Sequence, residues 1–181
     1  MKDVLTFLLL VFLIVVPIRI FVAQPFIVNG ASMDPTFNTG QYLIVDQLSY
    51  RFNSPKRGDV VVFRYPNDPN QFFIKRIIGL PGEKLEIQQG SVTVYSKENP
   101  SGVKLEEPYI KNNSKNDNLV IALNKDEYYV LGDNRSASSD SRSWGPLSAS
   151  EIIGRPLFRL IPFRTISIFP GKYKSDYIDP N

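Results

Sequence analysis

The chain has 181 residues, a length typical of one domain or of one domain with a modest appendage. Its 21 basic and 18 acidic residues give a formal net charge of +3, and the basic residues are scattered, which argues against a nucleic-acid-binding surface. The absence of cysteine and histidine excludes Ser-His-Asp and Cys-His catalysis, disulfides, thiol redox chemistry and ordinary zinc sites. If the protein is an enzyme, its general base is therefore a lysine, an aspartate, a glutamate or a tyrosine.

The N-terminal segment is apolar over the length of a membrane span. Residues 4–23 number 20, which is about what a helix needs to cross a ~30 Å hydrocarbon core. Pro17 would kink this helix or end its most regular part. A cleavable signal peptide is the competing interpretation, but cleavage after Ala23 would place Phe21 where a small residue is expected. We therefore expect a retained anchor over residues 1–23, whose orientation the flanking charges do not fix.

The rest of the chain has the pattern of a β protein. Short runs rich in Val, Ile, Phe and Tyr are separated by clusters of Gly, Pro, Asn and Asp, which favours an antiparallel domain like a barrel or a sandwich over residues 24–181. The predicted strands are residues 42–46, 59–65, 72–78, 84–89, 91–95, 118–122 and 127–131.

The remaining stretches are less regular. Residues 88–118 are polar and rich in turn formers, and predict a small peripheral insertion or a long hairpin. Residues 148–153 are compatible with one or two helical turns, and residues 172–181 with a frayed tail. The apolar runs 156–163 and 166–170 are either core strands or surface that touches a membrane, and we expect core strands.

Lys75 lies in a run whose alternation predicts a strand with an apolar face. Phe73, Lys75 and Ile77 would share that face. Desolvation between bulky neighbours would disfavour the ammonium form and lower the pKa of the lysine from its reference of about 10.4. The alternative is a lysine at a sheet edge with its ammonium group in water, and this strand alone favours that alternative.

Ser32 follows the apolar N-terminal segment, in the sequence NGASMDPT of residues 29–36. A serine hydroxyl is a weak nucleophile unless a neighbouring base removes its proton, and without histidine a neutral lysine is the best candidate for that base. The two small residues before Ser32 would leave its backbone open to a substrate, so its N–H could stabilise an oxyanion. Taken alone, however, the segment is better explained as a turn built on Asp34-Pro35.

Residues 131–145 form a third candidate segment, LGDNRSASSDSRSWG, which is rich in turn formers. Its charged residues can pair with one another: Asp133, Arg135, Asp140 and Arg142. We expect a hydrogen-bonded loop that holds the lysine in place rather than reacting itself.

Together with residues 57–66 and 74–83, these segments resemble the sequence motifs of type I signal peptidases. Four separated blocks follow the order of the family behind an N-terminal anchor. The resemblance implies a membrane-bound serine endopeptidase with a Ser-Lys dyad, which removes signal peptides from exported preproteins after a small-x-small motif such as Ala-x-Ala. It also implies a mainly antiparallel β catalytic domain on the extracytoplasmic side of the cell membrane, preceded by one transmembrane helix. Signal peptides and membrane lipid are the implied partners, with no metal, no cofactor and no nucleic acid.

The resemblance also implies roles for individual residues. Ser32 matches the nucleophile, Lys75 the general base, and Ser138 the hydroxyl that orients the lysine. Residues 26–29 and the strand carrying Ile74 match the pair that clamps an extended substrate by β-strand addition. The resemblance gives a supporting role to Asp133, Asp140 and Arg142. The oxyanion or substrate-binding positions that it implies, besides Ser32, are Val28, Gly30, Met33 and Ile74.

Gly30 departs from part of the family, because some members have a serine there whose hydroxyl completes the oxyanion hole. The second oxyanion donor is therefore open. Two other interpretations also remain: a self-cleaving Ser-Lys protein related to SOS-response repressors, and a membrane-tethered, non-enzymatic β domain that binds partners.

Overall fold

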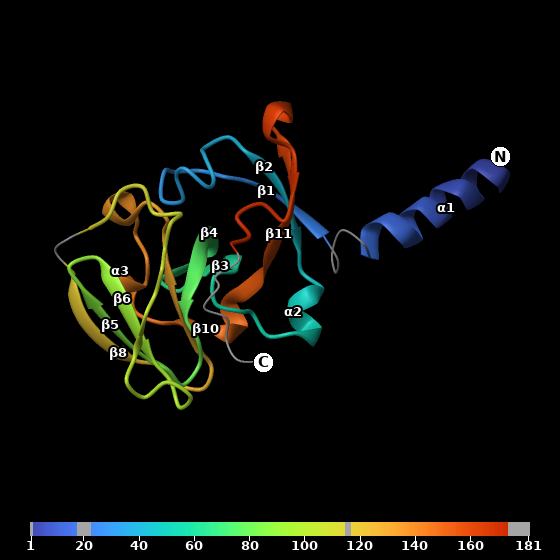
Figure 1. Ribbon diagram of the computed structural model, residues 1–181. Helices are drawn as coiled ribbons and strands as arrows, with labels where there is room; N and C mark the ends of the chain where they lie inside the picture. The colour runs from blue at the N-terminus through green and yellow to red at the C-terminus, as the bar shows by residue number, and fades with distance from the viewer. Residues whose placement is uncertain (1, 18–22, 115–116, 174–181) are drawn as a thin grey trace.

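The computed structural model describes residues 2–17, 23–114 and 117–173, and most of these lie in two antiparallel sheets (Figure 1). Within this described part, the larger sheet has eight strands, seven of them in the order β1-β2-β11-β3-β4-β9-β10, with β12 paired to β11. Its strands are β1 (Ala23–Ile27), β2 (Tyr42–Asp46), β3 (Val60–Tyr65), β4 (Asp68–Gly79), β9 (Glu127–Leu131), β10 (Leu147–Ser148), β11 (Ile152–Ile161) and β12 (Ser167–Ile168).

The smaller sheet has the order β7-β6-β5-β8 and appears in green and yellow beside the larger one (Figure 1). Its strands are β5 (Lys84–Gln88), β6 (Ser91–Tyr95), β7 (Val103–Lys104) and β8 (Asn118–Ala122). The helices of the described residues are short except for the first. They are α1 (Lys2–Pro17), α2 (Ser49–Phe52), α3 (Ser141–Trp144) and the 3-10 helices η2 (Arg135–Ala137), η3 (Ala149–Glu151) and η4 (Phe163–Thr165).

The predicted strands are confirmed, four of them with the same bounds: 42–46, 91–95, 118–122 and 127–131. The strand predicted at 72–78 is longer, because β4 begins at Asp68, directly after the turn that joins it to β3. The helical turns predicted at 148–153 are wrong in part. Only residues 149–151 form a 3-10 turn, opened by the Ser148 side chain accepting from the Ser150 N–H, and Ile152 already belongs to β11.

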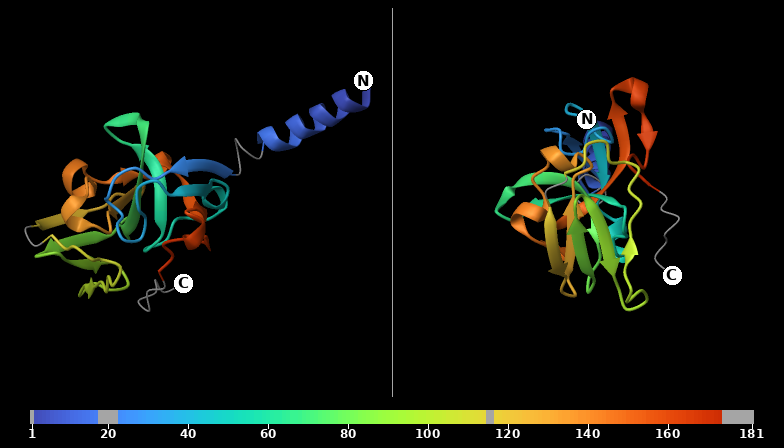
Figure 2. Two further views of the ribbon diagram at one scale, coloured as in Figure 1. Left: turned by 90° about the horizontal axis from the view of Figure 1, so that it is seen from above. Right: turned by 60° about the vertical axis from the view of Figure 1, so that its left-hand side comes forward.

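α1 projects away from the sheets in Figure 1 and in the left view of Figure 2. Its large apolar side chains from Val4 to Leu13 are exposed. The helix ends at Pro17, residues 18–22 lie outside the described residues, and Ala23 already belongs to β1 rather than to the predicted anchor. Among the described residues, no helix combines the length and the apolar character needed to span a bilayer. The predicted tail likewise falls, from residue 174 onward, outside them.

β4 contributes to three hydrophobic clusters at once. Ile78 belongs to the cluster under the smaller sheet, Ile77 to one that includes Phe63 and Val130, and Ile74 packs against a third. Because alternate strand residues point to opposite faces, a strand segment with core on both sides buries the side chains of both faces, as β4 does over residues 75–79. β4 therefore places Lys75 and Arg76 in the interior, where they are 4% and 1% exposed.

The C-terminal apolar runs are only partly core, which corrects the expectation of core strands. Pro156 in β11 is buried, but the chain beyond it leaves the core: Phe163 is 78% exposed and Ile168 65%. Their neighbours Ile161 and Ile166 are also exposed. Ile27 in β1 is exposed as well, and β2 pairs Tyr42 with both Ile27 and Ile161, so these side chains share one end of the sheet.

Candidate active site

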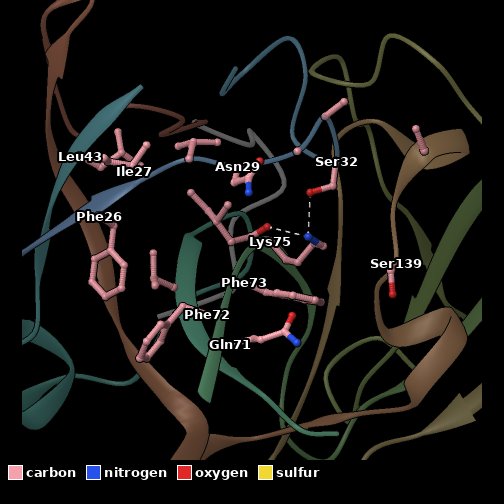
Figure 3. Close-up of a pocket in the computed structure, with 16 residues that line it drawn as sticks. Phe26, Ile27, Asn29, Ser32, Leu43, Gln71, Phe72, Phe73, Lys75 and Ser139 are labelled. Atoms are coloured by element: carbon pink, nitrogen blue, oxygen red, sulfur yellow. Dashed lines mark hydrogen bonds between the residues drawn. The ribbon is translucent and has the colours of Figure 1, made fainter. Parts of the chain in front are cut away.

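Ser32 and Lys75, 43 residues apart in sequence, are in contact. The Lys75 amine lies 2.8 Å from Ser32 Oγ, and it also donates to the Ile74 carbonyl oxygen at 2.9 Å (Figure 3). β4 carries the lysine, and the turn after β1 carries the serine. The structure therefore brings together the serine and the lysine that the absence of histidine suggested as a pair.

Lys75 is almost wholly buried, with 4% of its surface exposed. β4 is an inner strand between β3 and β9, with Lys75 opposite Val61, so the sheet-edge alternative is wrong. The Phe73 ring lies 5.1 Å from the Lys75 nitrogen. Burial lowers the pKa of Lys75 to about 8, while the negative charges of Asp140 and Asp133 act in the opposite direction. Near neutral pH a useful fraction of this amine is unprotonated and able to accept a proton.

The backbone donors of the turn around Ser32 differ in whether they are already engaged. The Ser32 N–H makes no hydrogen bond with any described residue. The Gly30 N–H, in contrast, donates to Thr39 Oγ1 at 3.1 Å, and Gly30 has a φ of 97° that favours glycine. Gly30 thus shapes the turn with its N–H already engaged, whereas the Ser32 N–H stays without a partner among the described residues.

The loop of residues 131–145 is hydrogen-bonded to the backbone of Ser32. The Asn134 N–H donates to the Ser32 carbonyl oxygen at 3.0 Å, and the Asn134 side chain to the Ala31 carbonyl at 3.1 Å. Gly132 packs so closely that a Cβ there would overlap the Ser32 carbonyl and the Ser138 hydroxyl. The loop therefore sets the position of the backbone that carries Ser32, and Gly132 and Asn134 are residues of the candidate site that sequence reasoning did not single out.

Asp133 joins the two halves of the site. Its carboxylate accepts from the Arg76 guanidinium at 2.8 and 2.6 Å, in an ion pair about 1% exposed on each side. It also accepts from Thr36 Oγ1 at 2.6 Å, and Thr36 belongs to the turn after Ser32. The expectation that the loop's charges pair with one another is therefore wrong for Asp133, whose partner comes from β4.

Asp140 and Arg142 do pair within the loop, as predicted, with Arg142 Nε 2.8 Å from Asp140 Oδ1. Burial by itself would raise the pKa of Asp140. The hydrogen bonds and charge of Arg142, with the Gly132 N–H at 3.0 Å, outweigh it and hold that pKa below its usual value. Asp140 is thus a buried carboxylate that fixes the Gly132 backbone.

Two predicted residues lie differently from their expected roles. No hydrogen bond within the described part joins Ser138 Oγ to Lys75; that hydroxyl is buried behind Gly132. Met33 is 1% exposed and packs in the core with Phe37 and Leu43, beneath the groove rather than in its lining. The position of Met33 next to Ser32 in the sequence did not predict where its side chain points, because successive residues of a turn point to different sides.

A groove of about 420 Å³ opens onto the dyad (Figure 3). It runs between residues 26–32 and residues 71–75, so the two predicted clamp segments, with Val28 and Ile74, form its walls. Its lining combines apolar side chains such as Phe26, Ile27 and Phe72 with polar ones. The polar side chains are Asn29, Ser32 and Lys75, together with Gln71 and Ser139 (Figure 3). A groove between residues of β1 and β4 has the form of sites that bind an extended chain by strand addition.

Comparisons with known proteins agree with this chemistry. The model of the family "Signal peptidase, peptidase S26" matches residues 1–161. The chain is 36% identical to the probable signal peptidase I-1 of Synechocystis sp., over 89% of this chain and 83% of the relative. It is 39% identical to signal peptidase I of Leptolyngbya laminosa (80% and 72%), and 34% identical to signal peptidase IB of Staphylococcus aureus (79% and 80%).

A crystal structure of a signal peptidase I from Enterococcus faecalis is 31% identical, covers 57% of this chain and 97% of that one, and gives a TM-score of 0.48. The family match over most of the chain sets aside the non-enzymatic interpretation. With a buried amine beside a serine and relatives of this kind over most of its length, the chain belongs to the signal peptidase family, peptidase S26, and is a serine peptidase of the signal peptidase I type.

Proposed function

We propose that the protein removes signal peptides from exported preproteins after a small-x-small motif, with Ser32 as nucleophile and Lys75 as general base. The observation that carries the proposal is the 2.8 Å separation between the Ser32 hydroxyl oxygen and a lysine amine that is almost wholly buried. Desolvation keeps part of the amine neutral, and the short distance allows direct proton transfer.

In the proposed mechanism, the Ser32 hydroxyl attacks the scissile carbonyl while its proton passes to the neutral Lys75 amine. The Ser32 N–H donates to the resulting oxyanion. The lysine then gives the proton to the leaving amine as the C–N bond breaks, which leaves an acyl ester on Ser32. A water molecule then attacks the ester while passing a proton to Lys75, and the lysine returns that proton to Ser32 Oγ as the ester C–O bond breaks and the acid product leaves.

The groove supports a preference for small side chains beside the cleaved bond. Substrate backbone would add as a strand between residues 26–29 and Ile74, so alternate side chains would point into the groove. We expect a preprotein with an Ala-x-Ala site to be cut, and variants with Phe at either alanine to lose at least about tenfold in kcat/KM. Equal cleavage of all three substrates, measured by gel densitometry or mass spectrometry, would contradict the small-x-small specificity.

We also propose that the N-terminal segment up to residue 22 anchors the enzyme and places the site beside the extracytoplasmic membrane face, where membrane lipid is the partner. A helix that is apolar all round and stands apart from the core is typical of a segment buried elsewhere, as α1 is from Val4 to Leu13. The exposed Ile27, Phe163 and Ile168 offer a second apolar surface. Flotation with liposomes, compared for the full chain and a chain lacking residues 1–22, tests the anchor: equal binding would contradict it.

The enzyme is expected to lose activity as pH falls through about 8. Protonation of Lys75, whose pKa burial lowers to about 8, removes the base. Because the neutral fraction falls about tenfold per pH unit below the pKa, kcat/KM at pH 6 is expected to be roughly one hundredth of its plateau above pH 9. Initial rates from pH 5 to 10 measure this, with thermal unfolding at each pH as the control for folding. A flat profile down to pH 5 would rule out a neutral lysine base.

A further inference from the structure

Glu107 is a buried carboxylate in the segment expected to be peripheral. It lies between β7 and β8, yet its side chain is only 6% exposed. It accepts from both terminal nitrogens of Arg135, and from the Tyr109 hydroxyl at 2.9 Å. The neighbouring Glu106, in contrast, is exposed. The sequence run LEEPYI therefore contains one carboxylate at the surface and one turned inward.

Through Arg135, Glu107 is connected to the backbone of Gly132, which packs against Ser32. Arg135, 4% exposed, donates from Nε to the Gly132 carbonyl oxygen at 3.0 Å. Gly132 packs against the Ser32 carbonyl with no room for a side chain. A shift of Arg135 would thus be passed to the peptide that supports Ser32.

The Tyr109 arm ends at the other side of the dyad. The Tyr109 ring lies 4.0 Å from the Arg76 guanidinium carbon, in a cation–π contact. Arg76 is the neighbour of Lys75 on β4 and holds Asp133 in the fully buried ion pair. The two routes therefore end on consecutive residues, one at the Gly132 carbonyl oxygen and the other at the Asp133 carboxylate.

The burial of Glu107 is not explained as a source of stability. A buried ion pair can often be replaced by apolar side chains at no loss of stability, because desolvation offsets most of the attraction. What such a pair supplies is a fixed geometry with bidentate hydrogen bonds. The segment also makes a second contact of this kind, from Asp117 to Arg142 at 2.7 Å.

We propose that Glu107 is a positioning residue for the peptidase reaction: it locks Arg135 and, through Tyr109, Arg76, and so fixes the Gly132–Asp133 peptide against Ser32 and Lys75. Glu107 touches neither reacting side chain and belongs to neither wall of the substrate groove. Its loss should therefore lower kcat while leaving KM unchanged. This proposal rests on the proposed Ser-Lys function.

The test compares Glu107→Gln with Glu106→Gln, which removes the same charge one residue away. Since a misplacement of about 1 Å can cost about 10²-fold, we expect Glu107→Gln to lower kcat by about 10- to 100-fold with KM within about twofold. Glu106→Gln should stay within about twofold in both. Rates are to be measured on an Ala-x-Ala preprotein and divided by the folded fraction from thermal unfolding. A kcat within twofold of the wild type after that correction would overturn the proposal.

Variants of Tyr109 test the second arm. Tyr109→Phe removes the hydrogen bond to Glu107 but keeps the ring over Arg76, and should lower kcat by about threefold. Tyr109→Leu removes both contacts and should lower kcat by about tenfold or more. Equal kcat values for these two variants would contradict the route through Arg76. If the wild type cleaves and Ser32→Ala does not, the proposed function stands whatever Glu107→Gln does, so the two failures are distinguishable.

Discussion

Replacing Ser32 with alanine is expected to lower kcat for an Ala-x-Ala preprotein by a factor on the order of 10⁶, as for loss of a nucleophile in other serine peptidases. Replacing Lys75 with methionine, which keeps the volume and removes the base, should have an effect of similar size. Because the two groups act in one proton transfer, the double variant should be no slower than either single variant. Steady-state and single-turnover cleavage assays with purified enzyme measure all three.

The matched controls are Ser101→Ala and Lys104→Met, since both residues are exposed and lie far along the chain from the dyad. Thermal unfolding separates lost chemistry from lost structure. With its pKa lowered by burial to about 8, Lys75 disfavours folding below that pH by about 3 kcal/mol. Lys75→Met is therefore expected not to lower the unfolding temperature at pH 7. A variant of either dyad residue that keeps kcat within tenfold of the wild type would refute the assignment.

Replacing Asp133 with asparagine is expected to cost about 3–5 kcal/mol of unfolding free energy, because it leaves the Arg76 guanidinium buried without its counter-charge. This is a large share of the roughly 5–15 kcal/mol typical of a domain. The carboxylate also accepts from Thr36, so the turn that carries Ser32 would lose its link to β4.

Urea unfolding at pH 7 measures this change, with Asp126→Asn as the matched control. Asp126 is exposed, so the same substitution there should leave the urea midpoint nearly unchanged. A loss below about 1 kcal/mol for Asp133→Asn would show that the ion pair is not held as the structure shows it.

Local patterns predicted the strands well. Elimination only indicated that a serine nucleophile would need a lysine base, and the resemblance to type I signal peptidases assigned those roles to Ser32 and Lys75. The alternation around Lys75 placed it beside Phe73, and the lack of histidine and cysteine left lysine as the natural base. What the sequence could not supply was which partner each buried charge takes. Asp133 has arginines two and nine residues away in its own loop, yet it pairs with Arg76, 57 residues distant, because only the sheet register brings them together.

The burial of the Glu107 side chain could not be predicted from the sequence for a related reason. Its segment is polar and rich in turn formers, a composition that usually marks solvated surface. Composition reports the average environment of a segment, whereas here two side chains, Glu107 and Tyr109, differ from their neighbours. These two side chains differ in this way because Arg135 and Arg76 lie beside them in the folded molecule, although both arginines are distant in sequence.

Lys75 and Arg76 are consecutive residues of β4 with opposite tasks, one facing the serine and the other facing Asp133. Which task each performs is set by the pairing of Val61 with Lys75 and Val60 with Arg76. A slip of one residue turns every side chain of a strand to the other face. The length of the short connection between β3 and β4, at residues 66–67, therefore determines which side chain faces Ser32. Deleting one residue there would place the permanently charged guanidinium of Arg76, instead of the titrating amine of Lys75, beside that serine.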